Sequence, residues 1–264
     1  MSERFPAVDA RTARRRFERA ASTYAGASRM ESEVGGRMLE RLEYLRIAPR
    51  RILDAGCGPA REAKALMRRY PKSRLFALDF ALPHLRRRLF DKRILLCGDI
   101  VQAPFADGSF DLVWSNMALH WARDPAAALR EFERVLAPGG LVMFSTLGPD
   151  TLKELRAAAG AGRVHAFFDM HDVGDLLVAA GLSAPVMDME MLEIAYRDPQ
   201  ELLQDLRRSG QTNARADRPR GLAGRRFAAR LRARLAPRAS FEVVYGHGWK
   251  REQMKTVRVF KRIP

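Results

Sequence analysis

The fold of this chain is decided by the stretch Arg51-Ile52-Leu53-Asp54-Ala55-Gly56-Cys57-Gly58-Pro59-Ala60. Its first half is a short apolar run that stops at an acidic residue, and its second half holds two glycines one residue apart. The following segment, 61–70, has helical composition. A strand, a glycine turn and a helix in this order are typical of an α/β sheet that binds a ligand at the strand's carboxyl end.

The same unit recurs along the chain. Short apolar runs alternate with helical segments as far as residue 146, and glycine and proline turns such as Pro138-Gly139-Gly140 separate them. Strands that alternate with helices imply a buried parallel sheet with right-handed crossovers. The predicted strands are 51–55, 74–78, 94–97, 111–115 and 141–146, and the predicted helices are 61–70, 83–90 and 125–136.

A helical prelude precedes this core. Within residues 1–49 the apolar side chains recur at helical spacing, with Phe17, Ala20, Ala21 and Tyr24 close to one face. Such spacing indicates amphipathic helices that pack against the rest of the molecule.

The part of the chain beyond Gly148 predicts two more strands and several helices. Between those strands lies an arginine-rich stretch, 199–237, which is too long for a simple connection, so we expect a helical insertion beside the site. Residues 1–264 are then a single α/β domain with a doubly wound, mostly parallel seven-stranded sheet. The additional strands are 185–191 and 241–245, and the additional helices are a segment ending at 159, then 171–180, 200–208 and 225–235.

Composition limits the class of protein. At 264 residues and 47% hydrophobic content, the chain is long enough to bury one sizeable core. Residues 1–5 are charged and lack an apolar run, so neither a secretory signal nor an anchor is expected. Cys57 and Cys97 lie in apolar contexts without a metal-spaced partner, so we expect two small buried side chains and no metal. With no stretch near the ~20 apolar residues of a membrane span, these features predict a cytoplasmic protein.

The chain is strongly basic, with 47 Lys and Arg against 31 Asp and Glu, or a net charge of +16. This balance favours an acidic partner: nucleic acid, an anionic membrane surface or an acidic carrier protein. The sign of the charge does not choose among them. Because seven of the 47 basic residues are Lys, codon composition is an alternative explanation of the arginine excess.

Acidic residues end three successive predicted strands: Asp54, Asp79 and Asp99. In an open parallel sheet, ligands bind outside the carboxyl ends of the strands. Gly56 and Gly58 leave room for a close ligand, and the helix beyond them offers backbone N–H groups to a carboxylate. Each Asp alone is better explained as a helix N-cap or a solvated turn than as a ligand contact. Three of them at successive strand ends favour a binding site.

These carboxylates fit one class of cofactor. Asp79 can accept hydrogen bonds from ribose hydroxyls, which leaves a nicotinamide enzyme open. Asp99 adds an acceptor for an adenine amino group, while Ile100 can pack on the ring and offer its N–H. The turn also lacks the Gly-x-Gly-x-x-Gly sequence of dinucleotide sites. Together these features favour S-adenosylmethionine.

The same stretches resemble the motifs of class I methyltransferases, which have a Rossmann-like sheet. The matching segments are 53–59, 79, 98–100 and 110–116. More narrowly, the chain resembles the malonyl-acyl-carrier-protein O-methyltransferase family of biotin synthesis over nearly its whole length. The signature stretches of that family are 17–24, 115–121, 147–155 and 169–172.

The resemblance implies roles for individual residues. Tyr24 would close over the cofactor, with residues 1–49 as a helical lid, and His120 would lie at the end of the fourth strand; both are predicted catalytic residues. The alternatives are a core-facing aromatic for Tyr24 and a packed histidine for His120. The implied cofactor-binding residues are Asp54, Gly56, Gly58, Asp79, Phe80, Asp99, Ile100, Asn116 and Leu119.

The family's reaction is methyl transfer to the free carboxylate of malonyl-acyl-carrier protein, and the basic stretch 199–237 would meet this acidic partner. The carboxylate is anionic at neutral pH, so no strong base is required, but an arginine should hold it. We predict Arg163 for this role. Two departures from the family pattern concern the same site: Ala60 replaces a glycine of the first motif, and Ala166 stands where many relatives have Arg.

Three other functions remain open. Residues 148–152 and 246–250 are also similar to complex I assembly factors associated with arginine hydroxylation. The net charge suggests an RNA methyltransferase, although the fourth strand ends Ser115-Asn116-Met117-Ala118 rather than Asn-Pro-Pro-Tyr, and no RNA-binding motif is appended, so nucleic acid is not the expected partner. A non-catalytic module that retains the cofactor fold is the third alternative.

Overall fold

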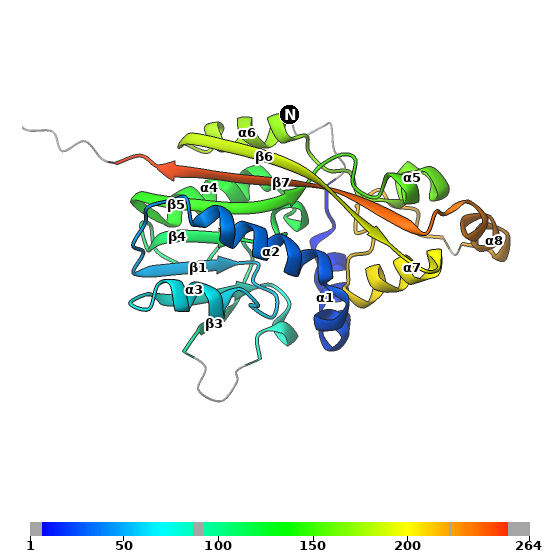
Figure 1. The fold of residues 1–264 in the computed structure, drawn as a ribbon, viewed down its shortest axis with the longest axis horizontal. Coiled ribbons are helices and arrows are strands. Elements are labelled where there is room, and N and C mark those ends of the chain that lie inside the picture. Colours follow the sequence, from blue (N-terminus) through cyan, green and yellow to red (C-terminus); the bar gives the residue numbers. More distant parts are fainter. Residues whose placement is uncertain (1–6, 87–91, 222, 253–264) are drawn as a thin grey trace, which may run out of the picture.

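The computed structural model describes residues 7–86, 92–221 and 223–252. Seven strands form one sheet in the order β3-β2-β1-β4-β5-β7-β6 (Figure 1). The pairs among β1 to β5 are parallel, whereas β7 runs antiparallel to β5 and β6. The predicted doubly wound sheet is therefore confirmed. Its strands are β1 (Arg51–Ala55), β2 (Arg74–Asp79), β3 (Ile94–Cys97), β4 (Phe110–Ser115), β5 (Leu136–Leu147), β6 (Leu182–Ala195) and β7 (Arg238–Lys250).

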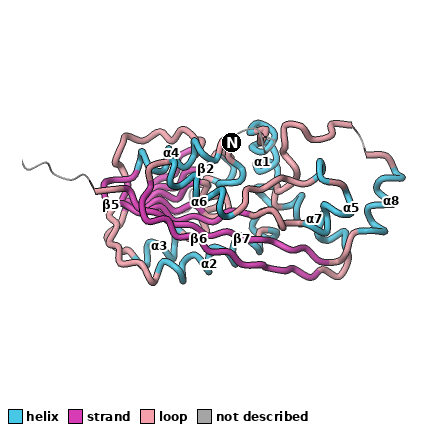
Figure 2. The backbone as a smooth tube through the Cα atoms, turned by 90° about the horizontal axis from the view of Figure 1, so that it is seen from above, coloured by secondary structure: helices cyan, strands magenta, loops and turns pink. Residues whose placement is uncertain are grey.

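Helices cover both faces of the sheet (Figure 2). Successive strand residues point to opposite faces, so Ile52 and Trp114 pack under α2 (Arg29–Leu42) and α3 (Ala63–Arg69). Their neighbours Leu53 and Val113 pack under α4 (Pro125–Val135) and α6 (Met170–Ala179). The order of the strands reverses between β1 and β4, which places a ligand site at their carboxyl ends.

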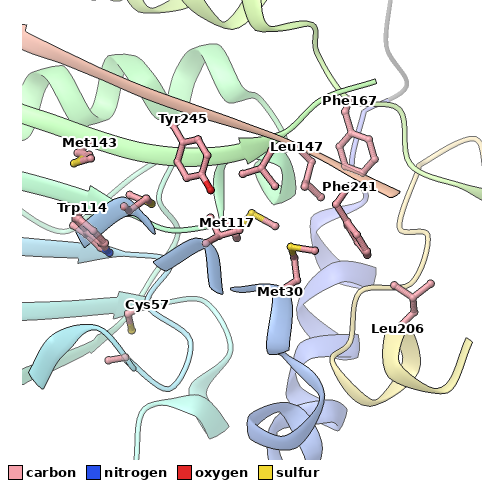
Figure 3. Close-up of a cluster of buried hydrophobic side chains, with 14 of the residues drawn as sticks. Met30, Cys57, Trp114, Met117, Met143, Leu147, Phe167, Leu206, Phe241 and Tyr245 are labelled. Carbon is pink, nitrogen blue, oxygen red and sulfur yellow. The ribbon is translucent and has the colours of Figure 1, made fainter. Parts of the chain in front are cut away.

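The remaining helices gather beyond those carboxyl ends (Figure 1). They are α1 (Ala10–Ala27), α5 (Lys153–Ala159), α7 (Pro199–Arg208) and α8 (Arg225–Arg234). Side chains from the N-terminal helices and from the insertion between β6 and β7 pack against the sheet in one apolar cluster. Met30 of α2, Leu206 of α7 and Phe241 of β7 are buried together in it (Figure 3).

The segment after α7 is hydrogen-bonded to the chain just before α1. Asp9 N donates to Ala214 O at 2.8 Å, and Ala216 N donates to Ala7 O at 2.8 Å. The Thr23 hydroxyl in α1 donates to Arg208 O at 2.7 Å. The helical prelude and the arginine-rich insertion therefore form one cover over the carboxyl ends of the strands.

Several predictions from the sequence need correction. The helix predicted at 83–90 is a 3-10 turn, Leu82–His84, in its described part, and residues 87–90 lie outside the described residues. Strand β5 starts at Leu136 and includes the Pro138-Gly139-Gly140 segment that was predicted as a turn before it. Cys57 is buried as expected, but Cys97 is exposed, because β3 is an edge strand of the sheet. Among the described residues, no helix is long and apolar enough to cross a membrane.

Candidate functional site

A pocket opens at the carboxyl ends of β1, β2 and β4, beneath α1. The space between its lining residues is about 700 Å³, open solvent at its mouth included. We call it the switch-point pocket. Its lining includes eight of the predicted site residues: Tyr24, Gly56, Gly58, Asp79, Phe80, Asp99, Ile100 and Asn116.

The glycine turn leaves space that a side chain would fill. Gly56 has a φ of 75°, and a Cβ there would lie 2.3 Å from the Cβ of Ala118. Gly58 has a φ of 51° and faces the ring of Tyr24, whose Cε1 lies 3.8 Å from where a Cβ would be. Ala60 has a φ of 52°, a conformation that costs a residue with a side chain ~1–2 kcal/mol.

Asp79 closes this turn against β2. Its Oδ2 accepts a hydrogen bond from Gly58 N at 2.8 Å, and its Oδ1 accepts one from Ala81 N at 2.7 Å. Burial raises the pKa of Asp79 to about 6, although both hydrogen bonds favour the ionised form. A carboxylate has about four acceptor positions, so capacity remains for a ligand hydroxyl.

The third strand end offers a carboxylate of different character. Asp99 is exposed, and its Oδ1 accepts a hydrogen bond from Val101 N at 3.0 Å. The neighbouring Ile100 side chain is buried and lines the same pocket. An apolar side chain beside a partly free carboxylate suits an adenine ring and its amino group, as the sequence predicts.

Aromatic side chains line the pocket beneath α1. Phe17 lies 5.7 Å from Phe80 and 5.1 Å from Trp121, and Tyr24 lies 4.8 Å from His84, between ring centroids. Phe17, His84 and Trp121 were not predicted site residues, although Phe17 shares a helix face with Tyr24. Burial lowers the pKa of His84 to about 4, and its Nε2 has no hydrogen-bond partner among the described residues. That atom is available to a bound ligand.

A smaller pocket adjoins the first and shares Tyr24, Gly56 and Asn116 with it. This inner pocket holds Asp54, which was predicted with the others but does not line the switch-point pocket. Burial raises the pKa of Asp54 well above its usual value, and its Oδ2 has no hydrogen-bond partner among the described residues.

Glu31 of α2 lines both pockets and was not predicted. Asn116 Nδ2 donates to the Glu31 carbonyl oxygen at 2.8 Å, and Asn116 Oδ1 accepts from Ser145 Oγ at 2.8 Å. Asn116 therefore ties α2 to the ends of β4 and β5. The spacing of the sequence carried a signal for Glu31, because it shares the buried face of α2 with Gly35 and Met38.

Two predicted residues, Leu119 and His120, lie elsewhere. They line another pocket together with Thr146 and Ala166; this pocket meets the switch-point pocket at Ala122 and Arg123, but neither Leu119 nor His120 lines the switch-point pocket itself. His120 Nδ1 lies 3.3 Å from Thr146 Oγ1. Burial lowers the pKa of His120 to about 3, so its ring is neutral at pH 7. The roles assigned to these two residues stay predictions.

Arg163 lines a further pocket that meets the switch-point pocket at Trp121 and Gln211. Its guanidinium lies 4.0 Å from the ring centroid of Phe227 in α8. Arg207 lines this Arg163 pocket as well, and no acidic residue is among the described residues that line it. Two guanidinium groups in an otherwise mainly apolar lining suit an anion carried on an apolar chain.

The residues present therefore fit S-adenosylmethionine. The glycine turn provides a cradle, Asp79 and Asp99 provide acceptors at two strand ends, and buried polar atoms of His84 and Glu31 lack partners among the described residues. No metal is implied by this arrangement. Among the described residues there is no group of three or more His, Cys, Asp or Glu side chains placed to hold one.

Known proteins with similar sequences are methyltransferases. Residues 53–144 match the family model of the methyltransferase domain. A curated protein from Methylovorus sp. (strain MP688), named malonyl-[acyl-carrier protein] O-methyltransferase, is 45% identical, with 92% of this chain and 90% of the relative covered. Further curated relatives at 42–45% identity bear the same name.

Solved structures agree with the fold. The YcgJ protein from Bacillus subtilis superposes with a TM-score of 0.60 at 20% identity, covering 84% of this chain and 99% of that protein. A SAM-dependent methyltransferase from Thermotoga maritima superposes with a TM-score of 0.55 at 17% identity, covering 90% and 100%. At such identities the likeness shows a shared fold.

Proposed function

The chain belongs to the malonyl-[acyl-carrier protein] O-methyltransferase family, and on that premise we propose that it transfers a methyl group from S-adenosylmethionine to the free carboxylate of malonyl-acyl-carrier protein. One observation in the structure supports this acceptor above others. A pocket with two arginines and no acidic residue in its described lining meets the switch-point pocket at Trp121 and Gln211.

The reaction needs positioning more than acid-base chemistry. When bound, S-adenosylmethionine would supply a methyl carbon activated by its sulfonium: the carboxylate oxygen would bond to that carbon as the sulfur–methyl bond breaks, leaving S-adenosylhomocysteine as the neutral thioether. The protein's task is then to hold that oxygen at ~3 Å from the carbon and to exclude water. No group with a pKa near 7 is needed to remove a proton, which agrees with the neutral, buried state of His120.

Arg163 and Arg207 provide the positive charge for the substrate. Neither guanidinium forms an ion pair with a carboxylate among the described residues, and that of Arg163 lies over the Phe227 ring. The apolar remainder of the pocket, which includes Leu203 and Leu231, suits the acyl part of the thioester. In this arrangement the carboxylate lies near the junction with the switch-point pocket.

Tyr24 and α1 exclude water from the cofactor. The Tyr24 ring faces Gly58 and lines both the switch-point and the inner pocket. Burial raises the pKa of its hydroxyl well above the usual value, so the side chain is neutral at physiological pH. We assign the described part of the N-terminal segment, residues 7–49, the role of a lid, with Tyr24 as its contact with the bound cofactor.

The exposed helix α8 is the proposed docking surface for the acidic carrier protein. Its ten residues include five arginines and no acidic residue, and none of its residues is buried. The stripe formed by Phe227 and Leu231 lines the Arg163 pocket, so a carrier docked on α8 would sit at the mouth of that pocket. Contacts of this kind steer association and weaken with added salt.

The comparisons do not favour the other activities. The relatives at 42–45% identity carry the malonyl-carrier name, not that of an arginine-modifying or RNA-modifying enzyme. An acceptor panel tests this directly: malonyl-carrier, total RNA and a complex I subunit peptide are each incubated with methyl-labelled cofactor. We expect label on malonyl-carrier alone. Label on RNA or peptide, with none on malonyl-carrier, would overturn the proposal.

A change in the Arg163 pocket separates substrate binding from cofactor binding. Arg163→Gln should raise the KM for malonyl-carrier by ~10-fold or more, because a charge-assisted hydrogen bond is lost. Binding of S-adenosylhomocysteine should not change. Arg208→Gln is the matched control, because Arg208 lies in the same helix as Arg207, is exposed and does not line the pocket.

A further inference from the structure

Glu31 has a carboxylate that the protein satisfies on one side only. Its Oε1 accepts a hydrogen bond from the side-chain amide of Gln211, whereas its Oε2 is buried and has no hydrogen-bond partner among the described residues. The residue is 7% exposed. A buried carboxylate that lacks a partner is costly, so the arrangement points to a group that is supplied from outside.

The charges around Glu31 do not neutralise it. Arg61 lies nearby, but its Nη2 donates to Ser28 Oγ at 2.7 Å and to the carbonyl oxygen of Ala25, and no ion pair joins it to Glu31 among the described residues. Glu62 adds a second acidic group on the same side. The inner pocket therefore presents three carboxylates, those of Glu31, Asp54 and Glu62, and one guanidinium around a common space.

This combination matches a zwitterion. The aminocarboxypropyl end of S-adenosylmethionine carries one ammonium and one carboxylate, and Gly56 of the glycine turn lines the same inner pocket. An ammonium donates hydrogen bonds, which Glu31 Oε2 can accept, whereas a sulfonium has no proton to donate. Arg61 supplies the opposite charge for the carboxylate of the same ligand.

We propose that Glu31 accepts a hydrogen bond from the α-ammonium of S-adenosylmethionine, with Gln211 holding the other carboxylate oxygen. The inference rests on the proposed function only for the identity of the cofactor. Gln211 belongs to the insertion after α7 and lines both the switch-point and the Arg163 pocket. The contact thus joins the N-terminal helices, the insertion and the two pockets at one point.

The acid-base state of the unliganded site agrees with this assignment. Burial raises the pKa of Glu31 to about 7, with Glu62 raising it further and Arg61 opposing the shift. Tyr24 and Tyr196 also lie close enough to Glu31 to interact with its charge. Burial raises the pKa of both tyrosine hydroxyls, so both are neutral near pH 7. An incoming ammonium favours the ionised carboxylate and completes its hydrogen bonding.

The test measures coupling between Glu31 and the amino group of the ligand. Isothermal calorimetry compares S-adenosylhomocysteine with its deamino analogue, on the full chain and on Glu31→Gln. The wild-type chain should prefer the amino compound by ~10-fold or more, as expected of a hydrogen bond between charged groups. Glu31→Gln should lose most of that preference. Glu33→Gln is the matched control, because Glu33 is an exposed residue of α2 that pairs with Arg37.

The possible outcomes are distinct. If Glu31→Gln keeps the wild-type preference for the amino compound, the inference is wrong while the cofactor assignment stands. If S-adenosylmethionine binding weakens but S-adenosylhomocysteine binding does not, Glu31 faces the sulfonium instead, and the inference is again wrong. If the wild-type chain binds neither nucleoside, the proposed function fails together with it. Thermal unfolding of each variant, with Glu31→Asp as a charge-preserving second variant, separates loss of folding from loss of binding.

Discussion

At the scale of single residues, Asp79 and Asp99 lie at neighbouring strand ends of the pocket but differ in burial and in hydrogen bonding. Asp79 is buried and accepts hydrogen bonds from two backbone N–H groups of the turns around it, so it is part of the architecture as well as of the site. Asp99 is exposed and binds one local N–H group. A change at Asp99 therefore tests the ligand contact more cleanly.

We predict that Asp99→Ala weakens S-adenosylhomocysteine binding by about 1–3 kcal/mol, because a hydrogen bond to a charged group is lost. Calorimetry measures the affinity, and urea unfolding should show little change in the free energy of unfolding. Asp188→Ala is the control, because Asp188 is exposed on β6 and pairs with Arg41. Equal affinities of Asp99→Ala and the parent chain would contradict the assignment of the third strand end.

Glu31 also predicts a pH dependence of stability. Folding raises its pKa from 4.5 to about 7, so the folded protein holds a proton that the unfolded chain releases. The free energy of unfolding of the unliganded protein therefore falls as pH rises through this window, by on the order of 3 kcal/mol from this group. Glu31→Gln removes the effect, so its stability relative to the parent should increase between pH 4.5 and 7 in urea titrations. A constant difference across that window would contradict the prediction.

The local sequence was enough to predict those pocket residues that lie at the carboxyl end of a strand. Gly56, Asp79 and Asp99 could be predicted because each follows a strand whose apolar run is plain in the sequence. The spacing within α2 indicates that Glu31 lies on a buried face, but which atoms of Glu31 and His84 lack hydrogen-bond partners depends on tertiary contacts, so their place in the site could not be predicted. Leu119 and His120 follow pocket residues such as Asn116 closely along the chain. They belong to the 3-10 turn Leu119–Trp121, in which their side chains line a different pocket.

At the scale of elements, α1 is hydrogen-bonded to the insertion. Hydrogen bonds from Thr23 to Arg208 O and from Asp9 N to Ala214 O join them, so a movement of α1 must involve the chain after α7. This pairing could not be predicted, because its partners are about 200 residues apart and no local pattern marks them. Charge composition did identify the insertion itself, since its arginines stand out in the sequence.

Tyr24 tests whether α1 is a lid or only a packed helix. We predict that Tyr24→Ala lowers kcat/KM by at least ~10-fold, because water reaches the cofactor and its positioning is lost. The free energy of unfolding should fall by much less than for a core aromatic, where truncation costs ~3–5 kcal/mol. Tyr44→Ala is the control, because Tyr44 is 87% exposed. Parallel losses of stability and turnover would support a core role instead.

The arginines of α8 test the docking surface. Changing Arg225, Arg226 and Arg230 to Glu should raise the KM for malonyl-carrier several-fold and flatten its dependence on salt, because attraction to an acidic carrier is reversed. Affinity for S-adenosylhomocysteine should stay the same. A matched triple change at Arg46, Arg50 and Arg68, exposed residues outside the insertion and away from the pockets, should have little effect on KM. Normal turnover of malonyl-carrier by the α8 variant at low salt would contradict the docking proposal.

At the scale of the whole molecule, three pockets meet beneath one cover. The inner pocket, the switch-point pocket and the Arg163 pocket share Tyr24, Trp121 and Gln211 at their junctions. The first two suit the polar and the nucleoside parts of the cofactor, and the third suits an anionic acyl group. The alternation of strands and helices predicted the sheet on which they lie, but their connection depends on tertiary contacts between the prelude and the insertion.

The central claim is that the acceptor atom is a carboxylate oxygen. Intact mass spectrometry of the carrier after incubation with cofactor tests it most directly, with malonyl-carrier and acetyl-carrier run side by side. The two thioesters differ in the free carboxylate, which the acetyl group lacks. We expect malonyl-carrier to gain the mass of one methyl ester, while acetyl-carrier stays unchanged. Equal methylation of both carriers, or of neither, would contradict the account.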